Sequence, residues 1–205
     1  FGTGIAGHDL QVLTQMRIFQ SDKEKRIAEG IRKGSHTAMK ELYDEWSGYL
    51  FALCLRYVPD RETASDILQD SFVKIFSGAS SFIYKGPGSL KAWISRIAVN
   101  EALQYLRKNR GRTMLEYKDI LPDISAEEPE EDDMRKIPSG VLLKMIGELP
   151  EGYRTIFNLS VFENMSHKEI AAALGISEST SASQFHRARK LLARKIKEYG
   201  KGLDR

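Results

Sequence analysis

Near the C-terminus the sequence carries a run of cations on a helical pattern. The stretch from Phe185 to Lys197 holds six basic residues and no acidic one: Arg187, Arg189, Lys190, Arg194, Lys195 and Lys197. Phe185, Ala188, Leu192 and Ile196 recur at three- and four-residue steps, which predicts a helix from Glu178 to about Tyr199 with these residues inward. Such a helix can neutralise phosphates while polar residues near its start contact base edges. The candidate base- and backbone-contacting residues are Ser179, Thr180, Ser183, Gln184, His186, Arg187 and Lys190.

The residues before this helix predict a second, shorter helix and a tight turn. Ser166 and Glu169 have the spacing of a capping box, in which each side chain bonds the other's backbone N–H. Gly175 suits the left-handed position that ends a helix, and Ser177 can cap the next one. A capped helix, a glycine turn and a second capped helix match the DNA-binding helix-turn-helix. A merely solvated basic helix is the simpler alternative, and the preceding turn signals favour DNA binding over it.

A second group of polar residues lies in the segment Asp66-Ile67-Leu68-Gln69-Asp70-Ser71-Phe72. Asp66, Gln69 and Asp70 share one helical face and are rich in hydrogen-bond acceptors. They can form charge-assisted hydrogen bonds with a basic partner. The alternative is that the two acids only interact favourably with the dipole of their own helix. Their position in the middle of the helix argues against this alternative, because the effect is confined to the first turn.

Aromatic and cationic residues follow in the loop 82–88 and the helix after it. Tyr84 and Lys85 offer stacking surface and charge on a flexible Gly-Pro-Gly backbone, as capture of an extruded base requires. Trp93, Arg96 and Asn100 share one face of the next helix; we expect Trp93 and Phe82 to be core or the floor of a pocket. Arg107, Lys108, Arg110 and Arg112 then form a cluster that can contact duplex backbone or simply favour the helix C-terminus.

These candidates lie on an all-α pattern with two helical modules. Apolar residues recur at helical spacing through 23–115, with Pro59 and the loop before Ser89 as breaks; Asp60 and Ser89 are the expected N-caps. Residues 119–133 hold eight acidic residues and no basic one, which predicts a flexible linker over 116–138. The expected divisions are therefore an extension at 1–22, a helical domain at 23–115, the linker, and a helix-turn-helix domain at 139–205.

The charge distribution fits two modules that bind a polyanion. The net charge of the chain is only +3, but residues 23–115 carry 16 basic and 10 acidic side chains, and residues 141–205 carry 11 and 7. The acidic linker cancels most of this surplus. Both modules therefore carry a net positive charge although the net charge of the whole chain is small, and this pattern is typical of nucleic-acid binding.

Composition excludes several other classes. The four histidines do not cluster with Cys54 or carboxylates at metal-ligand spacing, and no phosphate loop or nucleophile elbow is present. We therefore expect no metal, no cofactor, no small-molecule substrate and no catalysis. Cys54 lies in an apolar run and is expected to be a buried, inert thiol. No apolar stretch approaches the roughly 20 residues that span a bilayer, so a cytoplasmic protein is expected; Met16 is a candidate natural start.

Together these segments resemble bacterial RNA polymerase sigma factors of the extracytoplasmic-function (ECF) type. Residues 149–159 are similar to the entry helix of that family's C-terminal domain, and residues 166–191 to its reader of the minus-35 element. Residues 66–72 resemble the helix that docks on the β′ clamp of core polymerase. Residues 92–100 and 105–108 are similar to the helix that engages the melted minus-ten element. The resemblance covers about residues 23–200.

The resemblance implies partners as well as a fold. Core-polymerase contacts would fall on Asp66, Gln69, Asp70 and Phe72. Minus-ten contacts would fall on Tyr84, Lys85, Trp93, Arg96, Asn100, Arg107 and Lys108. The expected partners are core RNA polymerase through its β′ clamp and β subunit, promoter DNA, and an anti-sigma factor, which in this family is often membrane-bound. The linker is either a solvated tether or, as in this family, a segment that threads polymerase channels.

Three departures from the family pattern leave the promoter sequence open. Ser181 stands where an apolar residue is common, Ala182 where a basic one is, and Gln104 where an acidic residue or Asn is. Two other functions also remain open. A helix-turn-helix regulator would bind duplex DNA without polymerase and would not need the 66–72 and 82–108 segments. An interaction module, such as a decoy for an anti-sigma factor, would hold its partner without directing initiation.

Overall fold

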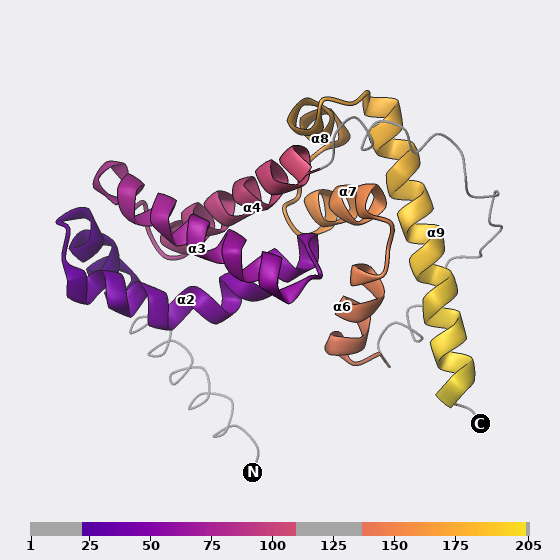
Figure 1. Ribbon diagram of the computed structural model, residues 1–205, viewed down its shortest axis with the longest axis horizontal. Coiled ribbons are helices and arrows are strands. Elements are labelled where there is room, and N and C mark those ends of the chain that lie inside the picture. Colours follow the sequence, from indigo (N-terminus) through magenta and orange to yellow (C-terminus); the bar gives the residue numbers. More distant parts are fainter. Residues whose placement is uncertain (1–21, 110–136, 204–205) are drawn as a thin grey trace, which may run out of the picture. The chain divides into compact units, whose positions relative to one another are not determined.

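The computed structural model describes residues 22–109 and 137–203, which contain helices and no β-strand (Figure 1). The chain divides into two compact units, Phe1–Cys54 with Glu62–Ala102 and Leu55–Arg61 with Leu103–Arg205. The predicted all-α fold with two helical modules is confirmed. The extension at 1–22, apart from Asp22, and the acidic linker, apart from residues 137 and 138, lie outside the described residues, as do Arg110 and Arg112.

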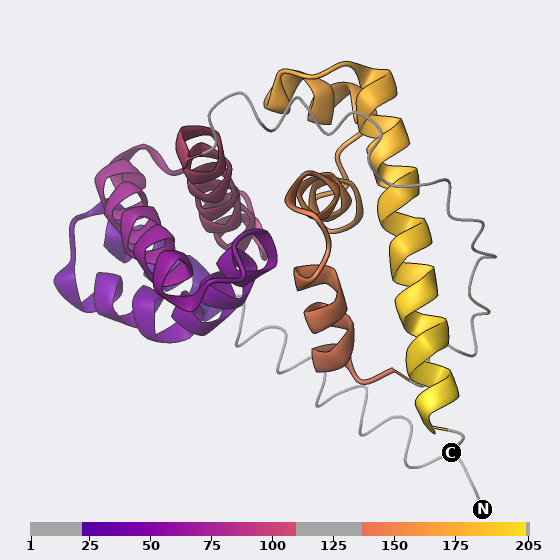
Figure 2. The same cartoon turned by 45° about the vertical axis from the view of Figure 1, so that its right-hand side comes forward.

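Residues 22–109, as the structure describes them, form four α-helices and one short 3-10 helix. A helix that includes residues 22–32 is followed by a turn in which Gly34 takes a φ of 75°. The later elements are α2 (His36–Tyr57), α3 (Arg61–Gly78), η1 (Ala79–Ser81) and α4 (Ser89–Asn109), and α3 and α4 lie side by side in both views (Figures 1 and 2). Their buried side chains follow the predicted stripes, among them Ile27, Leu42, Leu68, Ile75, Ile94 and Leu106.

Helix ends in this half follow the predicted breaks, with one correction. α2 ends at Tyr57, just before Pro59, and α3 begins directly after Asp60. Ser89, in contrast, does not cap α4, because the Gly88 carbonyl accepts the Ala92 N–H at 2.9 Å and Gly88 is therefore the N-cap. The Ser89 hydroxyl instead donates to the Gly86 carbonyl at 2.6 Å.

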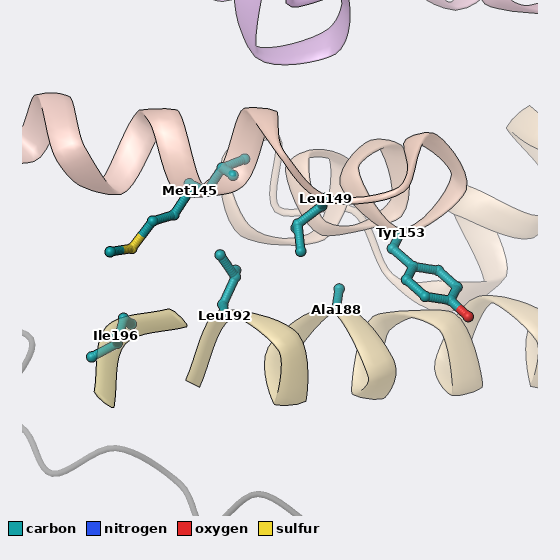
Figure 3. Close-up of a cluster of buried hydrophobic side chains, with 7 residues drawn as sticks. Met145, Leu149, Tyr153, Ala188, Leu192 and Ile196 are labelled. Carbon is teal, nitrogen blue, oxygen red and sulfur yellow. The ribbon is translucent and has the colours of Figure 1, made fainter. Parts of the chain in front are cut away.

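The second unit contains α6 (Ser139–Gly147), α7 (Glu151–Val161), α8 (His167–Leu174) and α9 (Glu178–Leu203). Its core lies between α9 and the pair α6 and α7: Figure 3 shows Met145, Leu149 and Tyr153 facing Ala188, Leu192 and Ile196. The inward face predicted for α9 is thus confirmed. Burial of this face is what holds the long, strongly basic helix in place.

Cys54 is fully buried and has no disulfide partner, as predicted. Burial raises the pKa of its thiol to about 12, so the sulfur stays protonated at neutral pH. A protonated, inaccessible thiol is a weak nucleophile, which leaves Cys54 a packing role.

Candidate DNA and polymerase interfaces

The helix-turn-helix predicted in the second unit is present with all of its local signals. The Ser166 hydroxyl accepts the Glu169 N–H at 3.3 Å, and the Glu169 carboxylate accepts the Ser166 N–H at 2.8 Å. Gly175 ends α8 with a φ of 69°, in the left-handed region. The Ser177 hydroxyl accepts the Thr180 N–H at 3.0 Å and so caps α9. These contacts fix the angle at which the reader helix leaves the turn.

Replacing Ser166 with alanine should destabilise α8 and change the titration of Glu169. Loss of a serine N-cap typically costs about 0.5–2 kcal/mol. Hydrogen bonds from the Ser166 side chain and backbone hold the pKa of Glu169 below its ordinary value of 4.5. Because the pKa of Glu169 is lowered in the folded protein, the stabilisation from the bonds of its carboxylate is present above the ordinary pKa. That stabilisation is lost as pH falls through the folded pKa. An NMR titration should show the Glu169 pKa rising toward 4.5 in the variant; an unchanged pKa would contradict the capping box.

The start of α9 presents most of the predicted reader residues outward. Ser179, Ser183 and His186 are exposed, and Thr180, Arg187 and Lys190 are half-buried. The hydroxyls of Ser179 and Thr180 lie 2.9 and 2.7 Å from the Ser177 hydroxyl, so the cap orients them. The exposed face of this first turn is therefore a preorganised polar surface.

Gln184 is a correction to the predicted reader set. It is 6% exposed and lies against α7, where its Oε1 would be 3.0 Å from a Cβ on Gly152. A side chain in this position cannot reach a base edge while the unit is folded. The signal was present in the sequence, because Gln184 precedes Ala188 by four residues and so belongs to the inward face.

Ser181 has a structural role that the sequence alone did not indicate. It is fully buried, and its hydroxyl lies 3.0 Å from Nδ1 of His167 at the start of α8. The same imidazole packs edge-on against Phe185, with ring centroids 5.5 Å apart. A polar contact thus joins the two helices at the position where an apolar residue was expected.

Part of the positive charge on α9 is balanced within the unit. Lys195 pairs with Glu148 at 2.6 Å and Arg194 with Glu198 at 2.8 Å. The Lys195 ammonium holds the pKa of Glu148 below its ordinary value. The other cations of the predicted cluster are all partly or fully exposed and stay candidates for phosphate contacts: Arg187, Arg189, Lys190 and Lys197.

On α3 the predicted polar face is present, but one predicted contact residue points inward. Asp66, Gln69 and Asp70 are exposed. Phe72 is only 5% exposed and packs on Tyr43, with ring centroids 4.8 Å apart, so it supports the helix and cannot touch a partner directly. Val73, which is 67% exposed and one turn beyond Asp70, was not among the predicted residues; its spacing of seven from Asp66 places it on the same face.

An aromatic pair joins the loop before α4 to that helix. Phe82 is 8% exposed and packs against the half-buried Trp93 in a tilted arrangement, with ring centroids 4.7 Å apart, which confirms that Phe82 is buried. In the same loop Lys85 is exposed and Tyr84 half-buried. Ile83 is 69% exposed and was not among the predicted residues. An exposed β-branched side chain beside a tyrosine and a lysine adds apolar surface for an unstacked base.

Helix α4 carries the remaining minus-ten candidates on its surface. Arg96 and Asn100 are exposed one turn apart, on the face that continues from Trp93. Arg107 and Lys108 are exposed in the last turn, and Nε of Arg107 donates to the Leu103 carbonyl at 3.3 Å. The Phe82–Trp93 contact joins the loop to the first half of α4, and the basic pair lies farther along the same helix.

Comparison with known proteins defines the class of this chain. The Sigma-70 region 2 family matches residues 42–112 and the Sigma-70 region 4 family matches residues 139–192. RNA polymerase sigma factor YlaC of Bacillus subtilis is 30% identical over 152 residues, which cover 73% of this chain and 84% of YlaC. ECF RNA polymerase sigma factor SigW of the same organism is 27% identical over 188 residues, 85% of this chain and 97% of SigW. The chain is a sigma-70 family protein, and it belongs to the ECF sigma factors.

A solved structure is similar at lower identity. The sigma factor RpoE from Bartonella quintana, in complex with the anti-sigma factor NepR, is 23% identical and gives a TM-score of 0.45; the match covers 78% of this chain and 96% of RpoE. Within residues 22–109 and 137–203, no helix is long and apolar enough to cross a membrane. The same residues contain no group of three or more His, Cys, Asp or Glu side chains placed to hold a metal ion.

Proposed function

We propose that each unit of this ECF sigma factor reads one promoter element while α3 holds core RNA polymerase. The exposed start of α9 reads the minus-35 element, and the loop 82–88 with Arg96 and Asn100 binds the melted minus-ten strand. The observation that most supports this division is that Ile83, Lys85, Arg96 and Asn100 are all exposed, while Phe82 and Trp93 pack against each other and so join the loop to α4. Neither surface contains a catalytic constellation, so the polymerase supplies the chemistry.

The docking face is defined by Asp66, Gln69, Asp70 and Val73 on α3. Three acceptor-rich side chains with one exposed apolar residue fit a basic helical surface, such as the β′ clamp presents in this family. We also propose that the protein is cytoplasmic. We further propose the β subunit of polymerase and an anti-sigma factor as partners, because ECF sigma factors typically bind both. Such a partner would compete with polymerase or DNA for one of the surfaces described above.

Transcript mapping tests the proposed function. The purified full chain is mixed with bacterial core RNA polymerase and genomic DNA fragments, and the transcripts that start specifically are sequenced. We expect discrete starts preceded by two shared motifs, absent without the chain. If the chain neither joined core polymerase nor changed initiation, yet bound duplex DNA alone, it would be an ordinary helix-turn-helix regulator instead.

Arg96 and Asn100 make separable predictions for binding of the melted strand. Replacing Asn100 with alanine should weaken binding of a minus-ten single strand by the holoenzyme about tenfold, through lost hydrogen bonds to a base. The salt dependence should not change. Replacing Arg96 with alanine should reduce the slope of log K against log salt by about 0.7, as expected for one single-strand phosphate contact. If the slope of log K against log salt were the same for both variants and the wild type, Arg96 would not contact a phosphate.

A further inference from the structure

Glu24 is a buried carboxylate far in sequence from the loop 82–88 and α4 but in direct contact with their backbone at Gly88 and Leu90. It lies in the helix of residues 22–32 and is 8% exposed. One carboxylate oxygen accepts the Gly88 N–H at 2.8 Å, and the other accepts the Leu90 N–H at 2.9 Å. Both oxygens are therefore directed at the start of α4.

These bonds replace a cap that α4 does not have in its own sequence. The first N–H groups of a helix lack partners within the helix. The N-cap is Gly88, which has no side chain, and the Ser89 hydroxyl is bonded to the Gly86 carbonyl and the Lys85 N–H. Glu24 supplies the missing acceptors from another helix, and its negative charge is favourable at a helix N-terminus.

The loop is consequently anchored at both ends. At its beginning Phe82 packs against Trp93, and at its end Gly88, with a φ of 83°, is held by Glu24. Between these anchors lie the exposed Ile83 and Lys85 and the half-buried Tyr84. The loop was predicted to be flexible from its glycines, but contacts at both ends fix it to two helices. A surface that is ordered before binding binds its ligand at a lower entropic cost.

We propose that Glu24 is a positioning residue for minus-ten recognition, which holds the loop 82–88 in the shape that captures an unpaired base. The inference rests on the function proposed for that loop. Glu24 itself is buried, so we expect it to act without touching DNA. Its carboxylate acts through Gly88 and Leu90, so its loss should weaken the contribution of the captured base and leave other DNA contacts in place.

The test measures how much one base contributes to binding, with and without the carboxylate. Holoenzymes containing the full-length wild type, Glu24→Gln or Glu29→Gln are bound to the promoter mapped for the wild type, with single abasic sites scanned through the minus-ten non-template strand. Glu29→Gln makes the same chemical change at an exposed position of the same helix. For the wild type and Glu29→Gln, we expect one abasic position to lower affinity about tenfold or more, the worth of one stacked base.

For Glu24→Gln the loss of affinity caused by that abasic position should fall to about threefold or less. The reason is that the free energy of a lost charge-assisted hydrogen bond is comparable to that of the base stacking it supports. Glu24→Asp, which keeps the charge on a shorter side chain, should give an intermediate penalty and carries the test if Glu24→Gln does not fold. An undiminished penalty in both Glu24 variants would overturn the inference and leave Glu24 a purely structural residue. A wild type with no abasic penalty at any position would overturn the role of the loop itself.

Discussion

Replacing Asp70 with lysine is expected to weaken binding of the chain to core RNA polymerase by at least about 30-fold. Asp70 is exposed in the middle of α3, on the face shared by Asp66 and Val73. Truncating one member of an interfacial charge pair typically costs about 2–5 kcal/mol, and reversing its sign adds repulsion. The measurement is the dissociation constant of fluorescently labelled chain with core polymerase, at several salt concentrations.

A matched control separates docking from net charge. Asp44→Lys makes the same change in charge at an exposed position of α2, where Asp44 forms a surface pair with Lys40. Exposed pairs of this kind contribute little to stability, so this variant should fold and bind normally. Equal loss of binding in both variants would show that bulk charge, and not the α3 face, determines affinity for polymerase.

Leu192→Ala should destabilise the helix-turn-helix unit by about 2–5 kcal/mol. Leu192 is 5% exposed and lies in the cluster that joins α9 to α6 and α7 (Figure 3). Removing its side chain leaves a cavity in a small core, and the basic helix loses the packing that positions it. Because a chain of two units need not unfold in one step, hydrogen exchange of the α9 amides is the appropriate measurement.

Val161→Ala is the control for that experiment. It also shortens an aliphatic side chain in the same unit, but Val161 is 44% exposed at the end of α7. Its expected effect is within about 0.5 kcal/mol, as for most surface substitutions. If Leu192→Ala left α9 exchange unchanged as well, the packing between α9 and the pair α6 and α7 would not be what stabilises the unit.

The sequence was sufficient wherever local signals decide the structure. Ser166, Glu169, Gly175 and Ser177 produced the predicted caps and turn, because a capping contact joins residues only three or four apart. The inward face of α9 followed from its period for the same reason. Exposure of Asp66 and Asp70, or of Arg96 and Asn100, could be predicted from spacing alone.

Contacts between distant segments were beyond local reasoning. Ser89 has the residue type of an N-cap, yet Glu24, more than sixty positions earlier, takes that role at α4. Phe72 was expected at the polymerase interface, but its ring packs against Tyr43 of α2. Ser181 was a departure from the family pattern whose contact with His167 only the fold reveals. Tertiary packing decides such positions, and periodicity in one segment carries no information about its partner.

The most direct test of the account is whether the two units read different promoter elements. A library of promoters randomised upstream and downstream is transcribed by holoenzymes carrying the wild type, His186→Ala in α9 or Asn100→Ala in α4. The account predicts that His186→Ala relaxes sequence preference only in the upstream motif and Asn100→Ala only in the downstream motif. If both variants relaxed the same motif, or if either left the preferences of both motifs unchanged, the assignment of one element to each unit would be contradicted.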